Sequence, residues 1–91
     1  MKTYKIVITR ASVMIAFPPG ANETVAAHVK ATYLGNPLKM VGTSSEISAD
    51  TLTLTLVRKF ATEADATAYS QDPVIVSWVA SLPNASAGLA A

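Results

Sequence analysis

The sequence predicts an α+β fold, a single domain with an antiparallel β-sheet of about five strands followed by one or two short C-terminal helices. Three observations lead to this prediction. Apolar and polar residues alternate through most of the first 60 positions, which is the period of a half-buried strand. Turn residues separate the alternating runs, and two helix-start signals follow the last run. The domain is expected to span residues 1–83, with a small-residue C-terminal tail over 84–91.

The first strand is expected over residues 3–9, where Tyr4, Ile6 and Ile8 share one face. Residues 12–17 repeat the alternation and predict a second strand. The two runs form either a hairpin turning at residues 10–11 or one bent or bulged strand. Two prolines and a glycine at 18–20 end this region.

Residues 24–33 alternate most regularly and predict a half-buried strand, with His28 on its more polar side. A turn at 34–37 and a short strand over 38–41 would complete a hairpin. Residues 42–50 are polar and rich in serine, so they are expected to form a loop. The next strand covers 51–60, where leucine and threonine alternate strictly.

Helix signals begin at Thr62, a suitable N-cap, because Glu63 and Asp65 complement the positive end of the helix dipole. Asp72 and Pro73 give a second start signal, an aspartate cap followed by proline at the first helical position. A helix over 73–82 is favoured by Pro73 and Pro83 at its two ends. The β-branched residues 74–76 leave a strand as the alternative.

Composition excludes several kinds of site. The 91 residues include no cysteine and one histidine, so one chain offers no disulfide, thiolate metal site or multi-histidine zinc site. The net charge of +1 creates no long-range field for nucleic acid or an anionic membrane, and the basic residues are dispersed. We expect no catalytic, cofactor or metal site, no small-molecule substrate, and neither a signal peptide nor a transmembrane segment.

Charged residues make up 14% of the chain, compared with roughly 25% in ordinary domains. Interface cores are depleted in charge, so part of the surface is expected to lie against a protein partner in a homo-oligomer or larger assembly. The expected interface residues are Thr51, Thr53 and Thr55 on the outward side of their strand, and Leu89 in the uncharged tail.

The stretch TLTLTLVRKFATEADATAYSQDPVIVSWV (51–79) consists of a threonine-rich strand, an Ala/Glu/Asp helix and a segment after Asp-Pro. It resembles the strand–helix ending of small phage-encoded virion proteins. The resemblance implies a non-enzymatic structural protein, such as a decoration, capsid or neck component, located in the virion after assembly in the host cytoplasm. The alternative is a small phage-encoded inhibitor or adaptor that binds a host protein.

The same stretch also resembles the strand–helix unit of dimeric α/β-barrel proteins, whose ferredoxin-like subunits include small monooxygenases. That resemblance implies a dimeric enzyme using His28 near Tyr33 or Trp78. The prolines and the expected hairpin within 18–42 depart from the β-α-β-β-α-β plan of that family.

Overall fold

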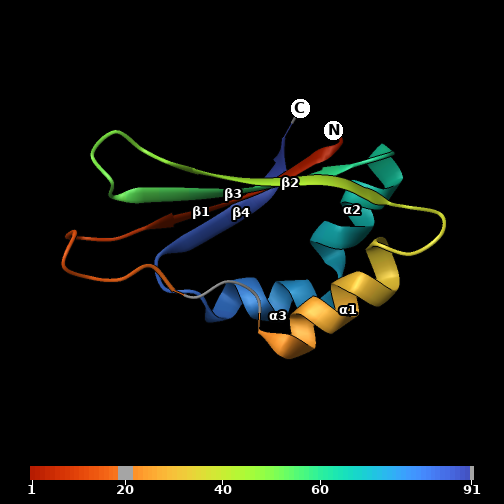
Figure 1. Cartoon of the computed structure of the whole chain (residues 1–91), viewed down its shortest axis with the longest axis horizontal. Coiled ribbons are helices and arrows are strands. Elements are labelled where there is room, and N and C mark those ends of the chain that lie inside the picture. The colour runs from red at the N-terminus through yellow and green to blue at the C-terminus, as the bar shows by residue number, and fades with distance from the viewer. Residues whose placement is uncertain (19–21, 91) are drawn as a thin grey trace.

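The computed structural model describes residues 1–18 and 22–90 and confirms an α+β fold. Within these residues, one antiparallel sheet of four strands is covered by three helices on one face, and its other face is uncovered (Figure 1). Along the chain the elements are β1 (Thr3–Thr9), α1 (Glu23–Tyr33), β2 (Met40–Ile47), β3 (Thr53–Phe60), α2 (Glu63–Gln71), α3 (Pro73–Ser81) and β4 (Ala85–Ala90).

The strand order is β2-β3-β1-β4, and every neighbouring pair is antiparallel. Consequently β1 and β2 run parallel to each other with β3 between them, which is the split β-α-β arrangement of ferredoxin-like folds. Helices α2 and α3 together occupy the place of the second helix. The predicted departure from this plan within 18–42 was therefore wrong, because a helix rather than a hairpin lies there.

The strand register divides the sheet into two faces. Tyr4, Ile6 and Ile8 of β1 are buried beneath the helices and pair directly with Arg58, Leu56 and Leu54 of β3. Directly paired residues point to the same side of a sheet. These residues therefore lie on the helix-covered face, where Tyr4, Tyr33, Phe60 and Tyr69 pack their rings edge-on or tilted, with centroids 5.0–6.1 Å apart.

Helix α1 corrects the strand predicted over 24–33. Val25, Val29 and Tyr33 stand at both even spacing and four-residue spacing, so the same residues satisfy a strand period and a helix period. The intervening alanines favour the helix. Asn22 decides its start, because the Asn22 side chain accepts a hydrogen bond from the Val25 amide at 3.0 Å as N-cap.

The strand predicted over 12–17 was also wrong. This segment forms turns and irregular backbone, and Val13, Met14 and Ile15 are exposed. Arg10 organises it: its guanidinium donates to the carbonyls of Thr51 and Ile15 and lies 4.1 Å from the centre of the Phe17 ring.

Two segments predicted to be irregular are strands. Residues 42–47, expected to be a loop, belong to β2, which is an edge strand with most residues exposed on both faces. Such a strand has no buried face to impose alternation. Residues 85–90, expected to be part of a separate tail, form β4 and pair with β1 from Ala85↔Ile8 to Ala90↔Thr3.

The predicted helices after residue 61 are confirmed. Thr62 caps α2, its hydroxyl accepting from the Asp65 amide at 3.1 Å, and Asp72 caps α3 with Pro73 at the first helical position. Trp78 and Ile75 of α3 are buried against the sheet side of the molecule. The β-branched run 74–76 is thus tolerated in a helix because tertiary burial outweighs propensity.

The placement of β4 gives a stability prediction. Leu89 pairs with Tyr4 on the helix-covered face and packs against the core, so Leu89→Ala is expected to lower the free energy of unfolding by about 1–2 kcal/mol. The control is Ser86→Ala, which changes an exposed residue of the same strand and is expected to cost under about 0.5 kcal/mol. Urea denaturation followed by circular dichroism measures both. Equal stabilities would contradict the core position of Leu89.

Candidate functional site

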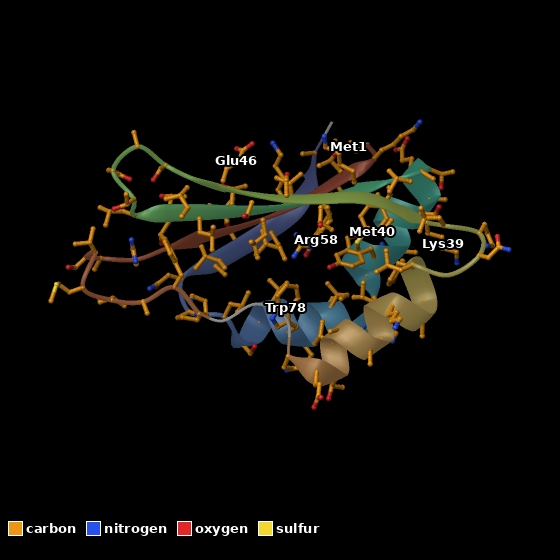
Figure 2. All side chains as sticks on the ribbon, viewed as in Figure 1. Met1, Lys39, Met40, Glu46, Arg58 and Trp78 are labelled. Atoms are coloured by element: carbon orange, nitrogen blue, oxygen red, sulfur yellow. The ribbon has the colours of Figure 1, made fainter. Side chains whose placement is uncertain are left out.

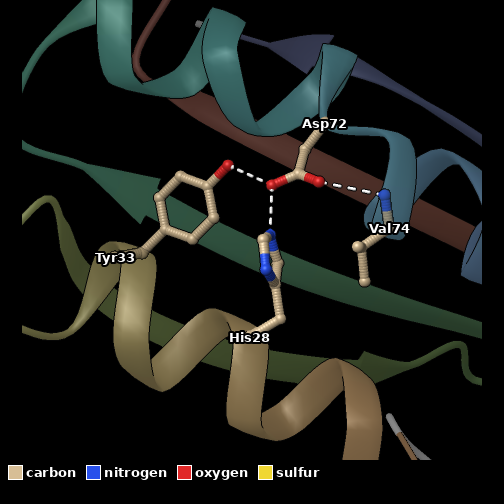
Figure 3. A network of polar contacts seen from close by, with 4 residues as sticks. All are labelled: His28, Tyr33, Asp72 and Val74. Carbon is tan, nitrogen blue, oxygen red and sulfur yellow. Dashed lines mark hydrogen bonds and ion pairs between the residues drawn. The ribbon is translucent and has the colours of Figure 1, made fainter.

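The carboxylate of Asp72 joins three parts of the helical layer (Figure 3). Its Oδ2 accepts hydrogen bonds from His28 Nε2 at 2.5 Å and from the Tyr33 hydroxyl at 2.7 Å, both residues of α1. Its Oδ1 accepts from the Val74 amide at 2.9 Å and so caps α3. The Asp72 side chain is 9% exposed and that of His28 is 31% exposed. One carboxylate therefore holds α1 against the junction of α2 and α3.

The environment shifts the pKa of two groups in this network. Burial alone would raise the pKa of Asp72, but the hydrogen bonds from His28, Tyr33 and the Val74 amide outweigh it and hold that pKa below its ordinary value. Burial, followed by the hydrogen bond to Asp72, raises the pKa of the Tyr33 hydroxyl well above its ordinary value. Asp72 thus stays ionised and Tyr33 stays protonated through the neutral range.

A carboxylate bound to a histidine is the arrangement that orients a general base. A substrate of such a base would have to lie against the His28 ring. His28, however, lines neither of the two hollows described below. The rings of His28 and Tyr33 also pack edge to face, with centroids 6.3 Å apart. The geometry therefore fits a structural contact between helices.

The second candidate is the open face of the sheet, the side away from the helices. Strand pairing places on it Thr3, Lys5, Val7 and Thr9 of β1, Gly42, Ser44 and Glu46 of β2, Thr53, Thr55, Val57 and Lys59 of β3, and Ser86, Gly88 and Ala90 of β4. Lys5, Glu46 and Lys59 are its charged residues. Val7, Thr55 and Val57 form the middle of this face, which is therefore weakly polar. Val57 is 6% exposed, and Val7 and Thr55 are half-buried.

The structure places the predicted interface residues on different surfaces. Thr53 and Thr55 lie on the open face, as expected for outward residues, but β3 is an interior strand and offers no free edge. Thr51 is exposed in the turn before β3, with φ at 62°. Leu89 lies on the opposite, helix-covered face against the core.

The described residues line two hollows in the helical layer. An open one of about 550 Å³ lies between the start of α1 and α3, and its polar lining includes Asn22, Ser77 and Ser81. A smaller cavity of about 230 Å³ lies between α1 and the sheet, and Arg58 and Tyr69 line it among apolar side chains. The sequence predicted neither hollow. The alternation over 51–60 places Arg58 in step with Leu54 and Leu56 on the inward face, but the helix that forms the opposite wall of the cavity was predicted to be a strand.

Comparisons with known proteins add no relative. The chain matches no family model, no curated protein and no solved structure. Among residues 1–18 and 22–90, no cluster of three histidine or acidic side chains could hold a metal ion. Within the same residues, each helix is too short or too polar to span a bilayer.

Sequence reasoning identified Asp72 as a helix cap but did not predict its two partners on α1. A helix over 23–33 would have supplied the missing signal, because it brings residues 28 and 33 within about 7.5 Å of one another along its axis, close enough for two long side chains to reach one acceptor. The strand prediction instead placed them on opposite faces.

The Asp72 network predicts an acid-sensitive contribution to stability. The folded-state pKa lies below the unfolded value of 3.8, so this contribution is present above about pH 4 and is lost as the pH falls through the folded-state pKa. Asp72→Asn is expected to lower the free energy of unfolding by about 1–3 kcal/mol at pH 7, since the charged acceptor of the buried Tyr33 hydroxyl and of the half-buried His28 is lost.

Denaturant titrations at pH 7 and pH 3 measure this effect. The difference between Asp72→Asn and the parent protein is expected to shrink at the lower pH. Glu46→Gln, an exposed carboxylate on β2, is the control and should change stability by less than about 0.5 kcal/mol at pH 7. A cost for Asp72→Asn that is the same at both pH values would contradict the proposed ionic contribution.

Proposed function

We propose that the protein is a non-enzymatic structural subunit that associates with a second copy of itself through the open face of its sheet. The observation that carries the proposal is the chemistry of that face. Two valines and four threonines occupy most of its two central strands, and these strands carry two lysines as their only charged residues there. Depletion of charge at the centre of a surface is typical of an interface core.

A second copy suits this surface for two further reasons. Two sheets pack face to face about 10 Å apart when their inner faces carry small and β-branched side chains, which the valines and threonines supply. The charges are also mixed, because Lys5 and Lys59 share the face with Glu46. A copy of the same surface therefore brings an acidic group as well as basic ones, and opposed faces need not repel.

Nucleic acid is a poorer candidate for the same face. Single-stranded RNA is bound on such sheets by aromatic side chains that stack on the bases. Of the described strands, β1 and β3 carry aromatic residues, and both Tyr4 and Phe60 point to the helix-covered face. Two lysines without a stacking surface give weak, nonspecific attraction at most.

The proposal also places this subunit in a larger assembly. That assembly is a virion, as the resemblance in residues 51–79 implies, and a small, weakly charged subunit would suit it. An inhibitor or adaptor that uses the open face for a different protein is the alternative. Enzymatic activity of dimeric α/β-barrel type is not part of the proposal, because Asp72 engages His28 as a contact between helices.

Sedimentation velocity over a dilution series tests the association. The parent protein is expected to shift with concentration from the 9.5 kDa of one chain towards twice that mass. Thr55→Lys adds a charge in the middle of the open face, where Glu46 beside it makes the lysine tolerable in the monomer. It is expected to weaken dimerisation by about tenfold or more.

Ser45→Lys is the matched control, because it adds the same charge to the exposed edge strand β2 but on the opposite face. It should leave the dimer intact. A parent protein that stays monomeric at every concentration would overturn self-association and favour the adaptor. Equal weakening by both variants would show that net charge, rather than the open face, governs association.

A further inference from the structure

The cavity between α1 and the sheet combines apolar walls with one cation. Every layer of the fold contributes to it: Val25 and Val29 from α1, Met40 from β2, Arg58 from β3, Tyr69 from α2 and Trp78 from α3. In Figure 2, Arg58 projects from the sheet to the helix side, with Met40 and Trp78 on the same side. The cavity is half open to solvent and is lined by side chains of helices and strands, so it is preformed, as small-molecule sites usually are.

Arg58 has no acidic partner in the described part of the chain. Its Nη1 donates to the Val57 carbonyl at 3.2 Å, and no carboxylate lies within 4.0 Å of its guanidinium. The guanidinium also lies beside the Tyr69 hydroxyl: burial raises the pKa of that hydroxyl, and the charge of Arg58 and a hydrogen bond from it oppose the rise. No buried side-chain nitrogen or oxygen of the described residues lacks a hydrogen-bond partner, so any Arg58 donors not bonded to Val57 or Tyr69 are open to the cavity. There they can pair with an anion or with water.

We propose that this cavity binds a small organic monocarboxylate with an apolar body, its carboxylate paired with Arg58. The planar guanidinium presents two parallel N–H donors that match a carboxylate. A single cation balances a single negative charge, which disfavours a doubly charged phosphate. The Val25, Val29, Met40 and Trp78 side chains would surround the apolar body.

The size of the cavity sets the size of the ligand. At about 30 Å³ per water, 230 Å³ corresponds to seven or eight waters, or to a ligand of roughly ten non-hydrogen atoms. Phenylacetate has this size and charge. Phenylacetamide has the same shape without the charge, so the pair isolates the contribution of the carboxylate. The proposal is independent of self-association through the open face, which lies on the other side of the sheet.

Titration with these two probes tests the site. Trp78 is the single tryptophan and lines both this cavity and the open hollow, so its fluorescence reports binding at either one. Arg58 lines this cavity alone, so dependence of the signal on Arg58 assigns the binding to it. Phenylacetate is expected to change the Trp78 emission saturably, with a Kd below about 10 mM, which requires only a modest binding contribution from each of about ten non-hydrogen atoms. It is expected to bind at least about tenfold more tightly than phenylacetamide, as a charge-assisted pair requires.

Arg58→Met keeps the unbranched stem of the side chain as far as the position of Nε and removes the charged guanidinium. It is expected to weaken phenylacetate binding by about tenfold or more and to leave phenylacetamide binding nearly unchanged. Lys30→Met removes an exposed charge of α1 that lines neither hollow and should change neither affinity. The comparison of acid and amide needs no variant, so it decides the matter even if Arg58→Met does not fold.

Two results would overturn the proposal. Equal affinities for phenylacetate and phenylacetamide would show that Arg58 contributes nothing to binding. An unchanged Trp78 emission with both probes at about 10 mM would show that the cavity takes no ligand of this size and that water satisfies the Arg58 donors.

Discussion

The helical layer depends on the single carboxylate of Asp72. This side chain receives two donors from α1 and one from the first turn of α3, at distances of 2.5–2.9 Å. Helices α2 and α3 are short, with nine residues each, and isolated helices of that length are unstable in water. The contact fixes the position of α1 over the sheet, which in turn places Val25 and Val29 at the cavity wall.

The parts of the fold that sequence predicted correctly are those with one unambiguous pattern. In β1 and β3, apolar and polar residues alternate because one face of each strand lies under the helices and the other faces solvent. Both strands lie in the interior of the sheet, so the burial of one face imposes the pattern along their whole length. The caps at Thr62 and Asp72 are equally local, because each acts on an amide two or three residues away. The α+β class follows from these elements alone.

The errors have a common physical origin in tertiary context. Val25, Val29 and Tyr33 fit both periods, so only the Asn22 cap and the alanines indicated a helix. Strands β2 and β4 are at the two edges of the sheet, where little burial imposes a pattern. The partners of Asp72 and the cavity wall opposite Arg58 depend on the packing of α1 over the sheet. Because residues 24–33 were predicted to be a strand, neither the Asp72 network nor the cavity could be predicted.

The pairing of β4 with β1 has a consequence for how the protein is made. Strand β1 leaves the ribosome before both of its partner strands, and one of its two edges gains its partner only when residues 85–90 have been synthesised. Until then, the nascent chain carries an unsatisfied edge beside Tyr4, Ile6 and Ile8, which is a template for pairing with other chains. The sheet can therefore be completed only after translation has passed Ala90. Slow synthesis or early cleavage within 61–84 would prolong the aggregation-prone state rather than release a smaller stable domain.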